Sequence, residues 1–452
     1  MGFFKAYDMR GTFGVDFDLN VVYRVGKALP AVVGGRKWLV GRDARATSPA
    51  VHDALVAGLR VAGADVTDLG LSTTPMVYFF TAQEDFDGSV MITASHNPPT
   101  DNGLKVSRKG ALPVGYESGL AEVEKIVASD VSVYSPDASA AVAPQGDDLE
   151  RRTRYVEWLK ANLAQARFPD FASVRVAVDC SDGMASILAH ELFPSAVFLN
   201  DVPDGRFPHH SPNPLLAEAR EQLAAVVRER GLDCGVIFDG DADRCMFVDE
   251  TGAFIQPDYL IPVLASTFPD ARDGKVVIHD VRTSRAAIEA IRALGCTPVM
   301  GRVGHAYAKV LLRETDAVCG GELAGHYYFR DFVHCDSGEL AALRLLGAFA
   351  EAKRKGQTVS AFLAPITRKY ANSGELNFKV DDKPAAIARI LATARDFGPE
   401  TARSDIDGYR LEFAEGWVSV RPSNTEPYLR LLVECDTPAR LAHWQTRLTA
   451  VM

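Results

Sequence analysis

An acidic stretch of this chain contains residues that could bind a metal ion. In VIFDGDADRCMFVDE, residues 236–250, Asp239, Asp241 and Asp243 alternate with a glycine and an alanine. The small spacers let the loop curl so that the three carboxylates converge. Three converging anions require a cation, and Mg²⁺ is the hard divalent ion that fits best. A solvated acidic turn is the alternative.

A calcium-binding EF-hand loop does not fit this stretch. The sixth loop position, where the turn needs Gly, is Arg244, and the flanking VIF and MFV predict strands where an EF-hand has helices. Arg244 instead places a guanidinium beside the carboxylates, where it could hold a substrate phosphate or hydroxyl.

A second stretch, ITASHNPPTDNGLK, residues 92–105, places Ser95 and His96 directly after the apolar run SVMI. Ser95 therefore lies at the C-terminal end of a predicted strand, where α/β folds commonly place sites. No Gly-x-Ser-x-Gly motif surrounds it, so a hydrolase triad is not indicated, and a turn serine bonded to its own backbone is the alternative. Lys105 lies at the start of another predicted strand, LKVS. With a metal loop elsewhere in the chain, these residues suit phosphoryl transfer, which needs in-line positioning and charge neutralisation.

Two further stretches offer groups that could bind a phosphorylated sugar. RPSNTEP, 421–427, combines the planar fork of Arg421 with hydroxyl, amide and backbone donors, which suits a phosphate; a polar hairpin turn is the alternative. GGELAGHYYF, 320–329, carries Glu322 between glycines and then His326. The carboxylate could accept two adjacent sugar hydroxyls, and a capped turn with a core histidine is the alternative. GHAYAK and AYDMRG add further His, Lys and Arg side chains.

Three parts of the chain repeat one order of elements that would position these loops. KWLVGRD (37–43), SVRVAVDCSDG (173–183) and GKVVIHDVRTS (274–284) each predict a strand that runs into a polar loop, a helix and a second strand. Such units build parallel or mixed sheets, so we predict three α/β domains of related design. Because any large α/β protein contains several such units, the pattern alone leaves the triplication open.

The remaining pattern divides the chain into four domains. SPDASAAVAPQGDD, 135–148, is small and polar and predicts a linker. The strands LNFKV, YRLEF, GWVSVRP and YLRLLVEC, with two helices, predict a small C-terminal α+β domain. We expect domains at 1–140 with the Ser95 loop, 141–250 with the acidic loop, 251–367 with the Glu322 loop, and 368–452.

Composition narrows the class of protein. The chain has 452 residues, of which 47% are hydrophobic, and a net charge of −10. It shows no basic run and no apolar run of the ~18–20 residues that span a bilayer, so we expect neither nucleic acid nor a membrane as a partner. The seven cysteines form no Cys-x-x-Cys pair, which predicts free thiols in a reducing cytoplasm and argues against zinc. We expect a monomer.

Taken together, these stretches resemble the motifs of the α-D-phosphohexomutases, in particular bacterial phosphomannomutase/phosphoglucomutase. TASHNP is similar to the family's phosphoserine loop, DGDADR to its metal loop, GELAGH to its sugar-specificity loop and RPSNTEP to its phosphate-binding loop. The resemblance covers essentially the whole chain, in order. It implies three related α/β domains with mixed sheets and a C-terminal α+β domain around a central cleft, in agreement with the pattern above.

The resemblance also implies roles for the matching residues. Ser95 would be the phosphorylated serine, and its phosphate would join Asp239, Asp241 and Asp243 in binding Mg²⁺. Glu322 would hold the 3- and 4-hydroxyls of the sugar. The other implied catalytic positions are His96, Lys105, Arg244 and His326, with Lys105 and His326 as candidates for proton transfer. The other implied substrate-binding positions are Tyr7, Arg10, Arg282, His305, Ala324, Arg421, Ser423, Asn424 and Thr425.

The implied activity is reversible phosphoryl transfer between O1 and O6 of glucose and mannose phosphates. It would proceed through a phosphoserine enzyme and a hexose 1,6-bisphosphate, with glucose 1,6-bisphosphate as activator. Such isomerases feed nucleotide-sugar and polysaccharide synthesis. Ala324 departs from the Ser of many members, and the lost hydroxyl removes about 0.5–1.5 kcal/mol of sugar binding.

Three alternatives remain. The first is phosphoglucosamine mutase, although the Leu323-Ala324 pair differs from the Gln-Ser usual in that branch. The second is a phosphoserine-dependent sugar phosphatase, which would not need a second phosphate cradle. The third is a sugar-phosphate sensor, which would not need a nucleophile.

Overall fold

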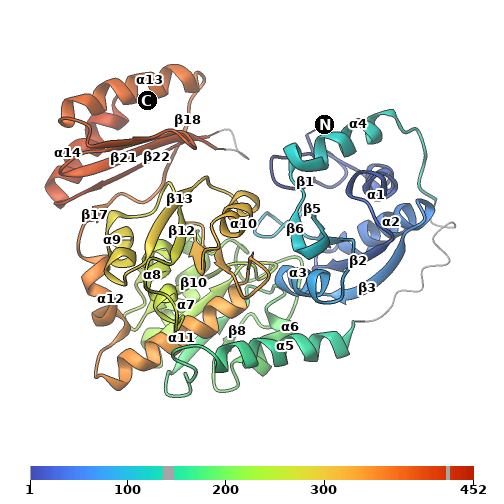
Figure 1. Ribbon diagram of the computed structural model, residues 1–452, viewed down its shortest axis with the longest axis horizontal. Helices are drawn as coiled ribbons and strands as arrows, with labels where there is room; N and C mark the ends of the chain where they lie inside the picture. Colours follow the sequence, from blue (N-terminus) through green and yellow to red (C-terminus); the bar gives the residue numbers. More distant parts are fainter. Residues whose placement is uncertain (1, 136–146, 424–427) are drawn as a thin grey trace.

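The computed structural model describes residues 2–135, 147–423 and 428–452, and the polar segment expected to be a linker falls mostly outside them. The chain forms four units, each built on its own sheet. Figure 1 shows the first unit in blue at the right and the fourth in red at the upper left, with the second and third units between and below them. The predicted fold class, three related α/β domains followed by an α+β domain, is confirmed.

The first three sheets share one strand order. Each has a first strand that pairs in parallel with a second and a third, a fourth strand antiparallel to the third, and a fifth antiparallel to the fourth. The orders are β3-β2-β4-β5-β1, β8-β7-β9-β10-β11 and β13-β12-β14-β15-β16. The topology therefore repeats three times, except that the edge strand β1 comes from the start of the chain.

The elements of the first two units are these. The first unit has β1 (Met9–Thr12), α1 (Leu19–Val33), β2 (Lys37–Arg42), α2 (Ser48–Val61), β3 (Asp65–Leu71), α3 (Thr74–Gln83), β4 (Gly88–Ile92), β5 (Asp101–Arg108), β6 (Leu112–Pro113) and α4 (Ala121–Ser129). The second has α5 (Leu149–Ala164), β7 (Val176–Asp179), α6 (Ser186–Leu192), β8 (Val197–Leu199), α7 (Ala217–Glu229), β9 (Cys234–Phe238), β10 (Cys245–Asp249) and β11 (Phe254–Ile255).

The other two units complete the chain. The third has α8 (Leu260–Ser266), β12 (Val276–Asp280), α9 (Arg285–Ala293), β13 (Thr297–Gly301), α10 (His305–Glu314), β14 (Cys319–Gly321), β15 (Tyr327–Phe329), β16 (Cys335–Asp336), α11 (Gly338–Arg354) and α12 (Val359–Thr367). The fourth has β17 (Ala371–Asn372), β18 (Leu376–Lys379), α13 (Lys383–Ala394), β19 (Ala402–Ser404), β20 (Tyr409–Glu412), β21 (Gly416–Pro422), β22 (Tyr428–Cys435) and α14 (Pro438–Thr449).

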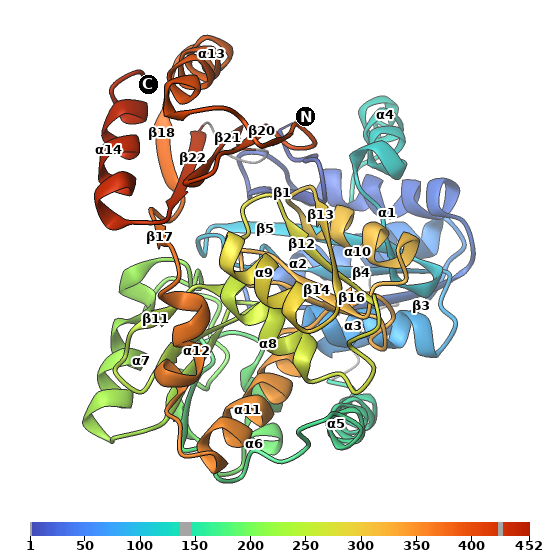
Figure 2. The same ribbon diagram turned by 60° about the vertical axis from the view of Figure 1, so that its left-hand side comes forward.

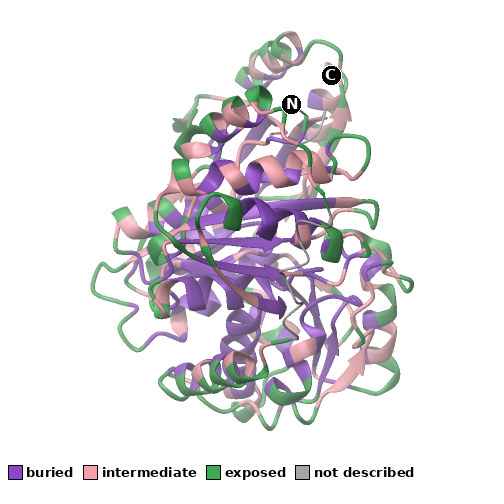
Figure 3. Ribbon diagram, turned by 90° about the vertical axis from the view of Figure 1, so that its right-hand side faces the viewer, coloured by how far each residue is buried: buried purple, intermediate pink, exposed green. Residues whose placement is uncertain are grey.

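The first three units share a hydrophobic core. Strands such as β4 and β9 are buried along their whole length, because helices cover both faces of these sheets. One continuous cluster of buried apolar side chains joins the three units. Within it, the rings of Phe79, Trp158 and Phe332, one from each unit, lie 5.1–6.4 Å apart between centroids. Figure 3 shows the buried strands running through the interior. This shared core fixes the three units relative to one another.

The fourth unit differs from the first three in its sheet and in its core. Its sheet is antiparallel, in the order β17-β22-β21-β20-β19 with β18 also on β22, and α13 and α14 contribute to a separate core. Figure 2 shows this unit standing apart from the others, where the chain enters it at β17. Much of its contact with the third unit is polar: Arg285 donates to Glu412, and Arg410 donates to the backbone oxygens of Val281 and Thr283.

Two whole-chain expectations can be compared with the structure. All seven cysteines are buried and unpaired, as predicted. Within the described residues, no helix has both the length and the apolar character needed to cross a bilayer.

Gly58 gives a test of packing in the first unit, where α1 crosses α2. Replacing a helical Gly by Ala ordinarily adds about 1 kcal/mol of stability. A Cβ at Gly58 would lie 2.1 Å from the backbone oxygen of Tyr23 and 3.0 Å from Cα of Gly26, and backbone atoms cannot yield cheaply. We expect Gly58→Ala to destabilise the unit by about 1–3 kcal/mol, the usual cost of overpacking.

Amide hydrogen exchange of α1 and α2 measures this change in one unit of a multidomain chain. Val61→Ala, on an exposed position of the same helix, is the control and should change stability by less than about 0.5 kcal/mol. Unchanged or slower exchange in Gly58→Ala would show that the helices can separate without loss.

Candidate active site

The predicted motifs lie at equivalent positions of the repeated sheets. The Ser95 loop joins β4 to β5, the acidic loop joins β9 to β10, and the Glu322 loop joins β14 to β15. Each loop connects the third strand of its sheet to the fourth, so the same hairpin tip is used three times. Arg421 lies near the tip of the β21–β22 hairpin of the fourth unit.

The first two tips meet at Ser95. Its hydroxyl donates to Oδ2 of Asp239 over 2.7 Å and accepts from Nη2 of Arg244 over 3.2 Å, and Nδ1 of His96 lies 3.2 Å away. Ser95 is buried and has a φ of 50°, a left-handed conformation that is unusual for a serine. The loop therefore holds this hydroxyl against the acidic loop of the next unit.

The three carboxylates form a buried cluster that fits a divalent cation. Asp239, Asp241 and Asp243 are fully buried, and each offers an oxygen within 4.8 Å of the others. Oδ1 of Asp241 and Oδ1 of Asp243 have no hydrogen-bond partner in the described part of the chain. Burial, opposed by Arg244 and reinforced by the other two carboxylates, raises the pKa of Asp239 to about 7. Buried unpartnered carboxylate oxygens are the ligands a hard metal ion requires.

Lys105 links the first unit to this cluster. Its Nζ lies 2.6 Å from Oδ2 of Asp241 and 2.5 Å from Oδ2 of Asp243. Burial disfavours the charge, but these carboxylates raise the pKa of Lys105, so the side chain stays protonated. The prediction that Lys105 starts a strand is wrong, because β5 begins at Asp101, whose polar segment pairs with β1.

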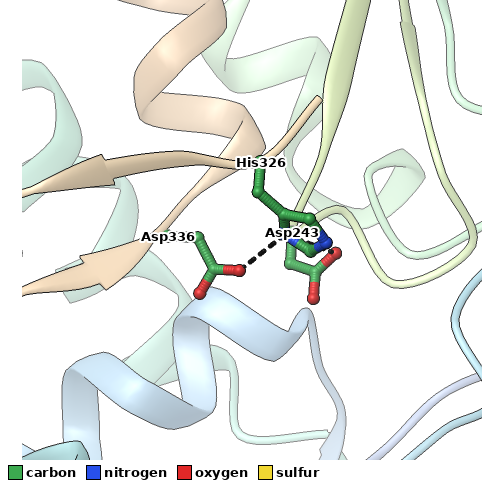
Figure 4. A group of neighbouring side chains, drawn as sticks. All are labelled: Asp243, His326 and Asp336. Atoms are coloured by element: carbon green, nitrogen blue, oxygen red, sulfur yellow. Dashed lines mark hydrogen bonds and ion pairs between the residues drawn. The ribbon is translucent and has the colours of Figure 1, made fainter. Parts of the chain in front are cut away.

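His326 belongs to a chain of polar contacts that the sequence did not indicate. Nδ1 of His326 lies 2.7 Å from Oδ2 of Asp336 and 3.8 Å from Oδ1 of Asp243, as Figure 4 shows. Oδ1 of Asp336 pairs with Nζ of the buried Lys309 over 2.8 Å. Burial lowers the pKa of His326, but Asp243 and Asp336 raise it more. This group also has the donors for a metal ion, but Lys309 and His326 already occupy Asp336, so the triple-aspartate cluster fits a cation better.

The Glu322 side chain is held through both of its carboxylate oxygens. Oε1 accepts from the backbone N–H of Gly304 over 2.7 Å and Oε2 accepts from the hydroxyl of Tyr328 over 2.8 Å. Ala324 follows as a half-buried residue. Both ring nitrogens of His305 are buried and lack a hydrogen-bond partner among the described residues.

A second cationic group lies where the third unit meets the fourth. Nε and Nη1 of the buried Arg421 have no hydrogen-bond partner in the part of the chain described here. Arg282 and Arg430 approach Glu375 at 3.3 and 3.1 Å. Glu375 and Arg430, which lie in an ordinary loop and in a strand, were not indicated by the sequence. Ser423 directly follows β21, and the predicted positions Asn424 and Thr425 lie outside the described residues.

Of the two N-terminal candidates, Tyr7 connects the first unit to the third, whereas Arg10 makes its contacts within the first unit. The hydroxyl of Tyr7 donates to the backbone oxygen of Val303 in the third unit over 3.0 Å. Arg10 donates to Oδ1 of Asn97 over 3.0 Å and to Asp8 over 2.5 Å. Arg10 therefore lies against the loop that carries Ser95.

Arg45 is a further residue that the sequence analysis missed. It is 1% exposed, and its guanidinium donates to the backbone oxygens of residues 95, 97, 98 and 101 over 2.5–2.9 Å. The ring of Phe207, from the second unit, lies 5.1 Å from the guanidinium carbon. Arg45 thereby fixes the backbone of the Ser95 loop, a role that its position after a strand does not reveal.

Comparison with known sequences identifies the class of protein to which this site belongs. Sequence models of the four domains of the phosphoglucomutase/phosphomannomutase family match the chain in order. Domain I matches residues 1–133, domain II 153–252, domain III 256–370 and the C-terminal domain 375–451. The chain belongs to this family of isomerases, which are intramolecular phosphotransferases.

Individual relatives support the same assignment. The chain is 37% identical over 450 residues to a protein of Xanthomonas campestris named phosphohexose mutases, covering 98% of this chain and 97% of that protein. It is 36% identical over 442 residues to a phosphomannomutase of Salmonella montevideo, covering 95% and 94%. The crystal structure of a phosphoglucomutase/phosphomannomutase family protein from Burkholderia thailandensis superposes with a TM-score of 0.85 at 31% identity, covering 100% and 96%.

The protonation of Asp239 predicts how metal binding depends on pH. A metal ligand must be ionised, so a proton on Asp239 competes with the metal. Because the pKa of Asp239 is raised to about 7, we expect Mg²⁺ affinity to fall as pH drops below 7, by about tenfold per pH unit. Above 7 it should level off.

Titration calorimetry with Mg²⁺ from pH 5.5 to pH 8, in buffers of different ionisation enthalpy, would measure both affinity and proton release. In Asp239→Asn the affinity should be weaker and its dependence on pH around 7 should disappear. A wild-type affinity that is flat across this range would contradict the assignment of Asp239 as a proton-coupled ligand.

Proposed function

We propose that this protein interconverts the 1-phosphates and 6-phosphates of glucose and mannose through a phosphoserine at Ser95. The observation that carries the proposal is the position of the Ser95 hydroxyl between Asp239 and Arg244, 2.7 and 3.2 Å away, beside an acidic cluster suited to a metal ion. Phosphoryl transfer needs such a carrier, surrounded by groups that neutralise the charge of the moving phosphoryl group.

The first step transfers the phosphoryl group from phosphoserine 95 to a free hydroxyl of the bound hexose phosphate. The P–Oγ bond of the phosphoserine breaks, a new P–O bond forms at the sugar, and the hydroxyl loses its proton to a base. Bound Mg²⁺, held by Asp239, Asp241 and Asp243, would neutralise charge on the phosphoryl oxygens. Arg244 and the protonated Lys105 lie where they can stabilise the same oxygens and the serine oxygen that is released.

The proton is moved by one of two candidates, Lys105 or His326. Lys105 keeps its proton because two carboxylates hold it, which suits a charge stabiliser and proton donor. Nδ1 of His326 is engaged by Asp336, which leaves Nε2 as the atom that can accept and return a proton.

The second half of the reaction needs both ends of the sugar to be held in turn. After the first transfer the ligand is a hexose 1,6-bisphosphate, and it must turn over so that its other phosphate can return to Ser95. Glu322 would hold the 3- and 4-hydroxyls in either orientation. The phosphate that is not reacting would be bound by Arg421, Ser423 and, as predicted from sequence, Asn424 and Thr425. Because the fourth domain has its own core, it can move to admit and release the ligand.

The proposed substrate range follows from the sugar hydroxyls that the site would contact. Glucose and mannose differ only at C2, whereas Glu322 would contact C3 and C4, so we propose that both sugars are substrates. Ala324 offers no hydroxyl to a further sugar group. The named relatives are phosphomannomutases and phosphohexose mutases, which favours this activity over glucosamine phosphate.

The direct test is ³¹P NMR of the purified protein with Mg²⁺ and a trace of glucose 1,6-bisphosphate. Glucose, mannose and glucosamine 1-phosphates are supplied in parallel. We expect comparable conversion of the first two to 6-phosphates. In Ser95→Ala, turnover should fall by several orders of magnitude while sugar phosphate still binds, because only the phosphoryl carrier is removed.

The other outcomes separate the alternatives. Conversion of glucosamine 1-phosphate alone would place the protein in the glucosamine-phosphate branch. Inorganic phosphate as the main product would indicate a phosphatase. Full turnover by Ser95→Ala would exclude Ser95 as the carrier.

The contact between Asp336 and His326 leads to a second prediction about turnover. If Asp336 fixes the ring and tautomer of His326, Asp336→Asn should lower kcat by about 10²–10⁴-fold, the range of a lost acid–base contribution, with little change in KM. Asp331→Asn, which removes a charge nearby that pairs with Arg344, is the matched control and should retain kcat. Steady-state kinetics of both variants measures this, and an unchanged kcat in Asp336→Asn would rule out the positioning role.

A further inference from the structure

A cavity of about 600 Å³ lies between the third and fourth domains, apart from the candidate active site. One wall is formed by α9 and by β13, and the other by β19 and β20 with the residues that follow it. None of the catalytic, metal-binding or sugar-binding candidates lines it. Its volume lies in the range of small-molecule sites in proteins, about 300–1,000 Å³.

The two walls of the cavity carry more positive than negative side chains. Four arginines and two glutamates line the cavity: Arg285, Arg292, Arg403, Arg410, Glu289 and Glu412. Glu289 is already paired with Lys369, which does not line the cavity, over 2.6 Å. Glu412 accepts from Arg285 and from Arg410, each over 2.7 Å.

Two guanidinium groups are left without a counter-ion. Arg292 on α9 and Arg403 on β19 are exposed, and neither forms an ion pair with any described residue, although Arg403 lies over the ring of Tyr409. Nη2 of Arg410, a side chain that is 1% exposed and lines the same cavity, has no hydrogen-bond partner among the described residues. A guanidinium group presents its N–H donors in a planar fork that matches the oxygens of a phosphate, and arginine is therefore a common phosphate ligand in proteins.

An apolar part of the lining is provided mainly by Ile288, Pro298, Met300 and Phe413, and the uncharged polar residues His279, Thr401 and Ser404 complete it together with two alanines. A simple inorganic anion would leave this surface unused. The combination therefore fits a molecule that carries phosphate at one end and a ring or other apolar group at the other.

The cavity is connected to the candidate active site through Arg410. Its Nη1 donates to the backbone oxygens of Val281 and Thr283, over 2.8 and 2.7 Å, on either side of Arg282. A ligand that binds Arg410 or Glu412 would therefore affect the loop that carries Arg282, one of the predicted substrate-binding residues.

We propose that this cavity is a second ligand site, which binds a phosphorylated small molecule of the nucleoside-diphosphate type and ties the third domain to the fourth. The phosphates bind Arg292 from one domain and Arg403 from the other, and the nucleoside lies against the apolar wall. Occupancy restrains the movement of the fourth domain.

The probe for this site is ADP, titrated by calorimetry in the absence of Mg²⁺. We expect saturable binding to the wild-type protein, weakened about tenfold or more in Arg292→Gln/Arg403→Gln, since each lost guanidinium removes a charge-assisted hydrogen bond. Arg272→Gln/Arg395→Gln removes two exposed arginines from the same two domains outside the cavity, and it should bind ADP as the wild type does. Hydrogen exchange should show that ADP protects both α9 and β19.

A further variant excludes the active site as the place of binding. Arg421→Gln should retain ADP affinity, because Arg421 does not line the cavity. Loss of binding in Arg421→Gln, equal binding in the two double variants, no saturable binding at millimolar ADP, or protection of one wall alone would each overturn the proposal. These experiments measure ADP binding and not turnover, so their outcome does not depend on whether the protein is a mutase.

Discussion

The burial of three carboxylates at the boundary between the first two domains is the constraint on which the rest of the site depends. Asp239, Asp241 and Asp243 are fully removed from water, and unpaired charges in such a position are strongly unfavourable. Lys105 from the first domain and Arg244 from the acidic loop supply two of the compensating charges. The remaining deficit is what a divalent cation would fill. The cluster is therefore stable only if the two domains keep a fixed relation.

The first three domains share one apolar core, which keeps them in a fixed relation, whereas the fourth domain has a core of its own. Transfer of a phosphoryl group tolerates little misplacement of the reacting atoms, so the carrier loop and the acidic loop must be rigid. Phe79, Trp158 and Phe332 join the first three domains in one apolar core. The fourth domain packs its own core and meets the third through ion pairs and backbone hydrogen bonds. In the proposed reaction, Arg421 of this separate domain would hold the phosphate that does not react, and that task tolerates some movement.

The sequence predicted those parts of the molecule in which local pattern decides structure. Apolar strands and the polar loops after them indicated α/β units, and the spacing of the three aspartates indicated a metal loop. The resemblance of four motifs to a known family supplied the triplication and most of the other candidate site residues. Asp336, Glu375 and Arg45 were not predicted, because their importance comes from contacts that only the folded chain creates: with a histidine ten residues earlier, with two arginines and with four backbone oxygens. The start of β5 was misplaced for a related reason, since its polar first residues are held by pairing with β1 and not by burial.

The acidic loop of the second domain and Arg421 of the fourth domain carry opposite charges, which explains how an acidic chain could bind a hexose phosphate. The net charge of −10 would by itself repel a hexose phosphate. The negative charge of the site, however, is concentrated at the β9–β10 tip, where a cation would bind. Arg421 has two nitrogens without a hydrogen-bond partner among the described residues, although Nη1 lies 3.6 Å from Oδ2 of Asp407, and it lies near the tip of the fourth domain's β21–β22 hairpin. In the proposed reaction, a ligand with a phosphate at each end would contact both of these tips, one through a bound cation and the other through Arg421. Because the two tips belong to domains with separate cores, movement of the fourth domain would change the distance between them.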